Sequence, residues 1–195
     1  SFEAIRNSHD AVLIATGVYK SRDLGGPGAG LGGIVRAIDY LTASNRIGFG
    51  DKVPEFDSGE LNAHDKKVVV IGGGDTAMDC VRTAIRQGAT SVKCLYRRDR
   101  ANMPGSVRET ANAEEEGVEF VWLAAPKGFT GETGVKGVIV QKMRLGAPDA
   151  SGSPVGCRHS SAGPHAGQAL GWAWKRRSAG SSYSAFDPAL MLWTM

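Results

Sequence analysis

The sequence predicts an α/β fold in which a parallel sheet carries flanking helices. Short apolar runs of strand type alternate with segments of helical spacing, in the order β-α-β-α-β with short connections. A glycine triplet separates the first strand of this series from its first helix. The alternation stops near residue 150, and residues 151–195, rich in serine, glycine and alanine, are expected to form a poorly structured tail.

A first strand is predicted close to the N-terminus. Residues 11–17, AVLIATG, form a continuous apolar run that ends at Thr16 and Gly17. Such a run is typical of a strand that is buried on both faces, and its final glycine permits a turn. The few residues before this run cannot supply the neighbouring strands that it needs.

The segment of residues 18–64 is predicted to be a linker with one helix. Residues 28–33, GAGLGG, match the dinucleotide-binding pattern G-x-G-x-x-G. That pattern binds phosphates where a buried strand precedes the turn and a helix begins at it. Charged residues and Pro27 precede this match, so we interpret it as a flexible interdomain loop. Residues 33–44 then show amphipathic helical spacing.

Residues 65–150 hold most of the predicted sheet. A β-branched run is stopped by three glycines, and apolar residues then recur at helical intervals until a glycine that suits a C-cap. The second predicted helix begins at the capping-box sequence S-x-x-E. The strands are predicted at residues 68–71, 91–98, 118–123 and 135–145, and the helices at about residues 75–87 and 106–116.

The glycine triplet lies in the context that a dinucleotide-binding turn requires. Residues 72–77, GGGDTA, match G-x-G-x-x-A in a Rossmann-like strand–turn–helix unit. Gly72 permits the tight turn, and Gly74 lets the backbone approach a pyrophosphate. Ala77 lets the helix lie close to the strand. Backbone amides at the helix start would then face the phosphates. The expected site residues are Gly72, Gly73, Gly74, Asp75, Thr76 and Ala77.

The end of the next strand favours NADPH over NADH. Units that bind NAD place an acidic residue there, which holds the ribose 2′-hydroxyl. Here the strand runs into Arg97 and Arg98, whose guanidinium groups suit a 2′-phosphate. Asp99 could reach a ribose or pair with an arginine, and the arginines could also be a solvated strand end.

Composition narrows the range of functions. The 195 residues carry a net charge of +3, and four basic residues and one acidic residue within 151–195 account for it, so the first 150 residues are neutral. Neither a nucleic-acid partner nor a membrane surface is indicated, and no apolar run approaches the length of a membrane span. Cys80, Cys94 and Cys157 lack C-x-x-C spacing, so we expect reduced thiols in a cytoplasmic protein and no metal site. No catalytic constellation is evident.

Four segments together resemble a known family. DAVLIATG, VVVIGGGDTAMDCVRTAIRQGA, YRRDRANMPGS and NAEEEGVEF are similar to the small (beta) subunits of NADPH-dependent glutamate synthases. These subunits belong to the FAD/NAD(P)-binding pyridine nucleotide oxidoreductases, flavoproteins with two dinucleotide-binding domains. The resemblance covers roughly residues 8–147 and is more specific than any single motif.

The resemblance implies an enzyme subunit that binds NADPH and passes a hydride to FAD. Electrons would continue through [4Fe-4S] clusters to the large (alpha) subunit, where 2-oxoglutarate and glutamine yield glutamate. It also implies that residues 65–150 form the NADPH-binding domain and residues 1–17 a residual strand of the FAD-binding domain, with Thr16 and Gly17 near the cofactor. A related ferredoxin- or pyrimidine-linked NADPH reductase and a non-catalytic nucleotide-binding fragment remain alternatives.

The sequence also departs from that family. The family's cluster cysteines and FAD glycine loop precede the equivalent of residue 1, and residues 151–195 replace the second half of its FAD domain. We therefore expect a fragment that binds NADPH, does not hold FAD or [4Fe-4S] by itself, and is inactive alone. The tail is either a disordered extension or the product of out-of-frame translation.

Overall fold

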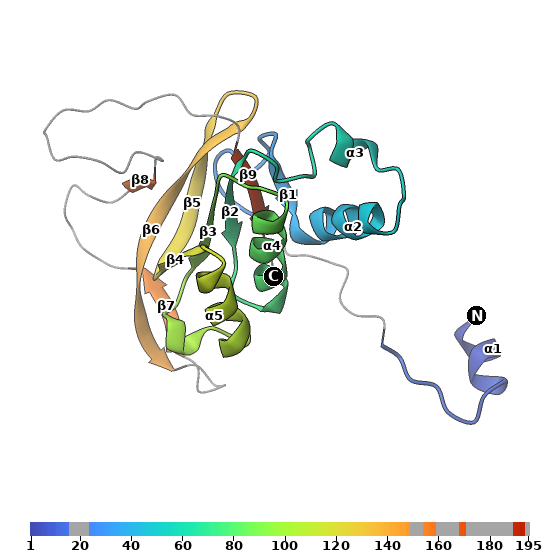
Figure 1. The fold of residues 1–195 in the computed structure, drawn as a ribbon. Helices are drawn as coiled ribbons and strands as arrows, with labels where there is room; N and C mark the ends of the chain where they lie inside the picture. The colour runs from blue at the N-terminus through green and yellow to red at the C-terminus, as the bar shows by residue number, and fades with distance from the viewer. Residues whose placement is uncertain (16–23, 149–153, 159–167, 171–188, 194–195) are drawn as a thin grey trace, which may run out of the picture.

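The computed structural model of the chain describes residues 1–15, 24–148, 154–158, 168–170 and 189–193. The main body has three layers: helices, a parallel sheet, and an antiparallel sheet on the opposite face (Figure 1). No helix in these ranges is both long and apolar enough to cross a bilayer.

The parallel sheet forms the middle layer. Its strand order is β1-β9-β2-β3-β4, and each neighbouring pair runs parallel. Ile71 at the end of β2 pairs with Leu95 near the end of β3, so these two strands end at the same edge. The strands are β1 (Ile34–Arg36), β2 (Lys67–Ile71), β3 (Ser91–Tyr96), β4 (Glu119–Trp122) and β9 (Ala189–Trp193). The predicted parallel arrangement is confirmed.

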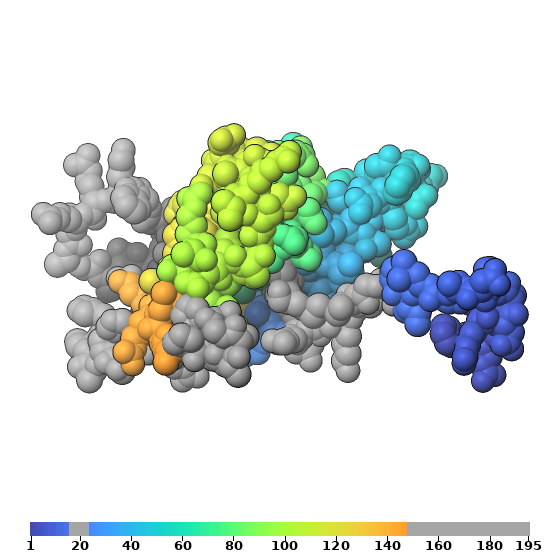
Figure 2. Space-filling view, turned by 90° about the horizontal axis from the view of Figure 1, so that it is seen from below, coloured from blue at the N-terminus to red at the C-terminus, as the bar shows by residue number. Residues whose placement is uncertain are grey.

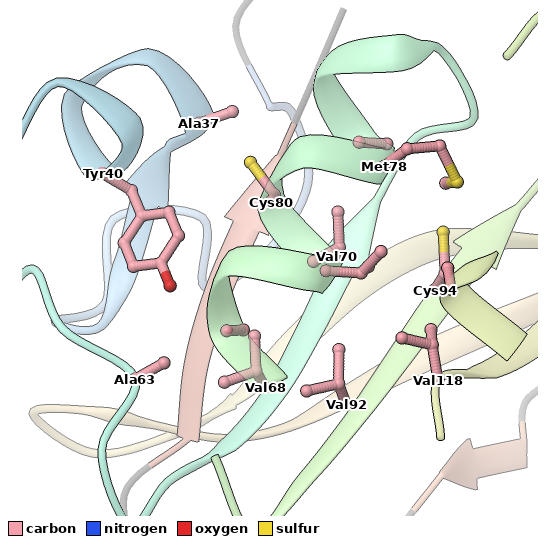
Figure 3. Close-up of a cluster of buried hydrophobic side chains, with 14 residues drawn as sticks. Ala37, Tyr40, Ala63, Val68, Val70, Met78, Cys80, Val92, Cys94 and Val118 are labelled. Atoms are coloured by element: carbon pink, nitrogen blue, oxygen red, sulfur yellow. The ribbon is translucent and has the colours of Figure 1, made fainter. Parts of the chain in front are cut away.

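Helices pack on one face of this sheet. Val68 and Val70 of β2 contact a core that α2, α4 and α5 share, and Met78 and Cys80 of α4 cover them (Figure 3). Alternate residues of β2 point to this face of the sheet, and they pack against the apolar stripe of α4. The helical elements are α1 (Phe2–Asn7), α2 (Ala37–Gly48), α3 (Pro54–Asp57), α4 (Asp75–Arg86), the 3₁₀ turn η1 (Arg100–Asn102) and α5 (Val107–Glu115).

An antiparallel sheet covers the opposite face. Val69 and Leu95 point to this side and pack with Phe129, Val138 and Val140 of the β5–β6 hairpin. The sequence pattern did not predict β5, and the strand predicted at 135–145 pairs with it rather than joining the parallel sheet. The strands are β5 (Ala124–Gly131), β6 (Val135–Pro148), β7 (Pro154–Arg158) and β8 (Gln168–Leu170).

The N-terminal segment differs from its predicted structure. Residues 11–15 form no strand, and Leu13 and Ile14 are 89% and 66% exposed. Backbone groups in a strand need partners, and no neighbouring strand reaches this segment in the part of the chain that is described. Figure 2 shows α1 standing apart from the body, in agreement with its lack of buried residues. Thr16 and Gly17 lie outside the described residues.

Other expectations need correction. The helix predicted from residue 33 begins only at Ala37, because residues 34–36 pair as β1. The tail of residues 151–195 is not wholly irregular, since it contributes β7, β8 and β9. Ser106 does begin α5, but its side chain forms no capping hydrogen bond.

The GAGLGG match is a packed turn rather than a free loop. Gly28 has a φ of 77°, and a Cβ atom there would lie 2.5 Å from the carbonyl oxygen of Phe129. Gly32 exchanges backbone hydrogen bonds with the hairpin, donating to Thr133 at 3.0 Å and accepting from Val135 at 2.8 Å. These glycines therefore serve the close approach of two backbones.

Candidate nucleotide-binding site

The glycine loop connects the end of β2 to the start of α4. Gly72 has a φ of 148°, which an L side chain rarely adopts. Its amide donates to the carbonyl oxygen of Leu95 at 3.1 Å, so the loop continues the pairing of β2 with β3 for one more residue. The first glycine of the motif is therefore required by the backbone conformation at this position.

Gly73 is required by packing. It is buried, and a Cβ atom at this position would lie 2.4 Å from Cδ2 of Tyr96. The Tyr96 ring is 7% exposed, and its hydroxyl donates to the carbonyl oxygen of Asn102 at 2.8 Å. Tyr96 is therefore fixed at both ends of its side chain and forms one wall of the loop.

Gly74 provides the open side of the loop. It is the N-cap of α4, and a Cβ atom there would meet no described atom within 4 Å. No side chain caps this helix. The first backbone amides of a helix lack intrahelical acceptors, and those of Gly74, Asp75 and Thr76 donate to no acceptor among the described residues. The loop thus fits a pyrophosphate, which would accept from these amides at the positive end of the helix dipole.

Ala77 allows this geometry. It is fully buried in the core between α4 and the sheet, and its amide donates to the Gly74 carbonyl oxygen at 2.9 Å. Thr76 is exposed beside the open side of the loop. Residues 72–77 therefore form a strand–turn–helix unit with a small buried residue at its last position, and their contacts with a nucleotide stay a prediction.

Asp75 faces another segment. Its Oδ1 accepts a hydrogen bond from the Ser106 amide at 3.0 Å. The Gly105 amide donates to the Gly73 carbonyl oxygen at 2.9 Å. The connection between β3 and α5 therefore lies directly against the glycine loop. Sequence reasoning missed Tyr96, Gly105 and Ser106, and only the Pro104–Gly105 pair before the helix start marks a turn there.

The two predicted arginines follow the end of β3, at the same sheet edge as the loop. Arg97 is exposed, and Arg98 is partly buried with its carbonyl oxygen accepting from the Leu123 amide at 3.0 Å. Arg100 forms an ion pair with Glu114 of α5 at 2.7 Å. Asp99 accepts from the Asn102 amide at 3.1 Å, so its carboxylate stabilises its own 3₁₀ turn.

The cysteines Cys80 and Cys94 are both buried. Burial raises the pKa of the Cys94 thiol to about 12, and Sγ donates to the Gly72 carbonyl oxygen at 3.3 Å. Burial also raises the pKa of Cys80. Both thiols therefore remain protonated near neutral pH. Within the described residues, no group of three His, Cys, Asp or Glu side chains could hold a metal ion.

Fold and site together define a dinucleotide-binding module of the kind that pyridine nucleotide oxidoreductases carry. The family model for pyridine nucleotide-disulphide oxidoreductases matches residues 4–172, and the chain belongs to this family. The complex of FprA with NADPH, from Mycobacterium tuberculosis, has a similar fold, with a TM-score of 0.64 and 16% sequence identity. The match covers 98% of this chain and 50% of that one.

The chain is also similar to curated proteins of one kind. The chain is 75% identical over 152 residues to a putative NADPH glutamate synthase small chain of Cereibacter sphaeroides, and 66% identical to the NADPH glutamate synthase small chain of Azospirillum brasilense. Each match covers 78% of this chain but only 36% and 32% of the relatives. The resemblance noted in the sequence is confirmed, and the chain spans about a third of these relatives' length.

Proposed function

We propose that the chain is the NADPH-binding part of an FAD-dependent oxidoreductase of the glutamate synthase type. NADPH supplies a hydride, which in the longer protein passes to FAD. Electrons then continue through iron–sulfur clusters to a large subunit that makes glutamate from 2-oxoglutarate and glutamine. The names of the curated relatives support this assignment.

One observation carries the nucleotide-binding part of the proposal. The uncapped start of α4, with its open Gly74, lies at the same sheet edge as the end of β3, where the arginine pair follows. In this proposal the amides of Gly74, Asp75 and Thr76 bind the pyrophosphate. Arg97 and Arg98 bind the 2′-phosphate, which a guanidinium group contacts with two parallel hydrogen bonds.

The proposal also assigns two segments of the chain to domains. Residues 1–17 belong to the FAD-binding domain of the longer protein, and residues 65–150 form the NADPH-binding domain. Thr16 and Gly17 would lie near the cofactor once that domain is complete. The described residues of this chain form one glycine loop of the required context, so we expect NADPH binding without retention of FAD or [4Fe-4S].

Separate titrations with NADPH and NADH test the proposal. Trp122 packs edge-on against Tyr96, with ring centroids 6.4 Å apart, so tryptophan fluorescence should report on ligands at the loop. We expect Arg97→Ala to weaken NADPH about tenfold or more and to leave NADH unchanged, since a charge-assisted hydrogen bond contributes about 1.5–3 kcal/mol. Arg46→Ala removes the same charge from the last turn of α2 and is the control.

Three results would contradict the proposal. These are the absence of a saturable signal with either nucleotide, equal affinity for both, and an Arg97→Ala variant that binds NADPH as tightly as the wild type. A purified chain that is yellow and reduces an artificial electron acceptor with NADPH would contradict the expectation that FAD is not retained.

A further inference from the structure

The segment that carries the arginine pair is fastened to the glycine loop at both of its ends. At its start, the Tyr96 ring packs against Gly73. At its end, the amides of Gly105 and Ser106 donate to the Gly73 carbonyl oxygen at 2.9 Å and to Asp75 Oδ1 at 3.0 Å. Residues 97–104 span the distance between these attachments.

Of these three attachments, only the one to Asp75 involves a charged side chain. It occupies the first position of α4, and Ser106 is the N-cap of α5, so the starts of two helices meet at one carboxylate. The positive ends of both helix dipoles favour a negative charge there. The same charge would, however, repel the phosphates of a nucleotide bound at the loop. A residue that opposes binding in this way needs a compensating role.

We propose that Asp75 is a positioning residue that sets NADPH selectivity. By accepting from the Ser106 amide, it fixes the separation between the glycine loop, which binds any dinucleotide, and the segment with Arg97 and Arg98, which distinguishes the 2′-phosphate. The inference rests on the proposed function of the site. It assigns to Asp75 a role through Ser106 rather than a direct contact with the cofactor.

The alternative role of a simple helix N-terminal charge predicts different behaviour. A carboxylate that only complements the dipole of α4 would affect stability and would change NADPH and NADH affinity by the same factor. A carboxylate that positions the arginine segment would affect mainly the nucleotide that has a 2′-phosphate. The ratio of the two dissociation constants therefore separates the roles.

The test compares three variants of the full chain with the wild type. Asp75→Ala removes the acceptor, and Asp75→Asn keeps an acceptor oxygen without the charge. Ser106→Pro removes the donor amide instead, and the φ of −55° at Ser106 is compatible with proline. Asp79→Ala is the control, because Asp79 is an exposed acid one turn further along α4.

We expect Asp75→Ala and Ser106→Pro each to lower the preference for NADPH over NADH about tenfold. Asp75→Asn should keep that preference within about twofold while binding both nucleotides more tightly, since the repulsion of the phosphates is gone. Asp79→Ala should keep the wild-type preference. Amide hydrogen exchange should be faster at the Ser106 amide in Asp75→Ala than in the wild type.

The outcomes distinguish failure of this inference from failure of the proposed function. If Arg97→Ala leaves NADPH binding unchanged, the proposed function of the arginine pair is wrong. If Arg97→Ala behaves as expected but Asp75→Ala and Ser106→Pro keep the wild-type preference, the positioning role of Asp75 is wrong. An Asp75→Asn variant that loses selectivity like Asp75→Ala would also overturn it. Ser106→Pro decides the matter if Asp75→Ala does not fold.

Discussion

Substituting the two adjacent glycines of the loop should separate folding from nucleotide binding. A Cβ atom at Gly73 would lie 2.4 and 2.5 Å from two ring carbons of Tyr96, whereas one at Gly74 would meet no described atom within 4 Å. Contacts below 3 Å force atoms to move. The Tyr96 ring cannot simply rotate away, since its hydroxyl is bonded to Asn102 and its ring is buried.

The expected loss of stability for Gly73→Ala follows from these contacts. Overpacking a closely packed site costs about 1–3 kcal/mol, and losing the hydroxyl bond of Tyr96 adds about 1 kcal/mol. The lower entropy of the unfolded alanine variant offsets about 0.4–1 kcal/mol of this cost. We therefore expect Gly73→Ala to lower the free energy of unfolding by about 1–3 kcal/mol.

Gly74→Ala is the matched variant. Its φ of −88° and ψ of 179° suit alanine, so the stability should remain within about 1 kcal/mol of the wild type. The added methyl group would instead occupy the space through which a pyrophosphate approaches the backbone. We expect this variant to fold normally and to bind both NADPH and NADH at least about tenfold more weakly.

Urea unfolding and nucleotide titration of the two variants provide the measurement. With a slope of about 2 kcal/mol per molar urea, the midpoint of Gly73→Ala should fall by about 0.5–1.5 M. The reasoning is refuted if Gly73→Ala unfolds at the wild-type midpoint, or if Gly74→Ala binds NADPH as the wild type does.

Three further predictions concern the helix layer. In urea unfolding, Gln87→Ala should lower the free energy of unfolding more than Tyr40→Phe does. Gln87 Oε1 accepts from both the Tyr40 hydroxyl and the Ala63 amide. Each donor that is left buried without an acceptor costs about 1–3 kcal/mol. Peptide mass spectrometry should find Cys80 and Cys94 unmodified by iodoacetamide at pH 8 until urea unfolds the chain, because burial raises both thiol pKa values. A hydrogen bond from Arg82 lowers the pKa of Glu116 below its ordinary 4.5, so Glu116→Gln should be less stable than the wild type at pH 7. In urea titrations that difference should vanish as the pH falls through the folded pKa.

The sequence predicted β2, β3 and β4 of the parallel sheet because these strands and the helices between them carry strong local patterns, whereas β1 and β9 were not predicted. Val68 to Ile71 are β-branched, and α4 has an apolar stripe that ends just before the C-cap residue Gln87 and the following Gly88, whose φ is 84°. These patterns are local in the sequence, so they can be recognised without knowledge of long-range contacts. The placement of Gly72 and Gly74 followed because a turn between such elements has few backbone solutions.

The missed features depend on contacts between distant residues. β5 contains Pro126 and two glycines, so its strand character comes from pairing with β6 rather than from propensity. The Asp75–Ser106 hydrogen bond joins residues 31 positions apart, and no local pattern signals it. Residues 11–15 show the converse case, in which a strong strand pattern lacks a partner among the described residues.

The exposed apolar side chains of the N-terminal segment have a consequence for the chain in solution. Phe2, Ile5, Val12, Leu13 and Ile14 are 38–89% exposed on a segment that stands apart from the body (Figure 2). Two molecules can bury these side chains against each other without disturbing either body. We therefore expect the chain to self-associate reversibly at high concentration, which light scattering should detect and dilution should reverse. Replacing these five residues by serine should abolish the attraction and leave the melting temperature unchanged.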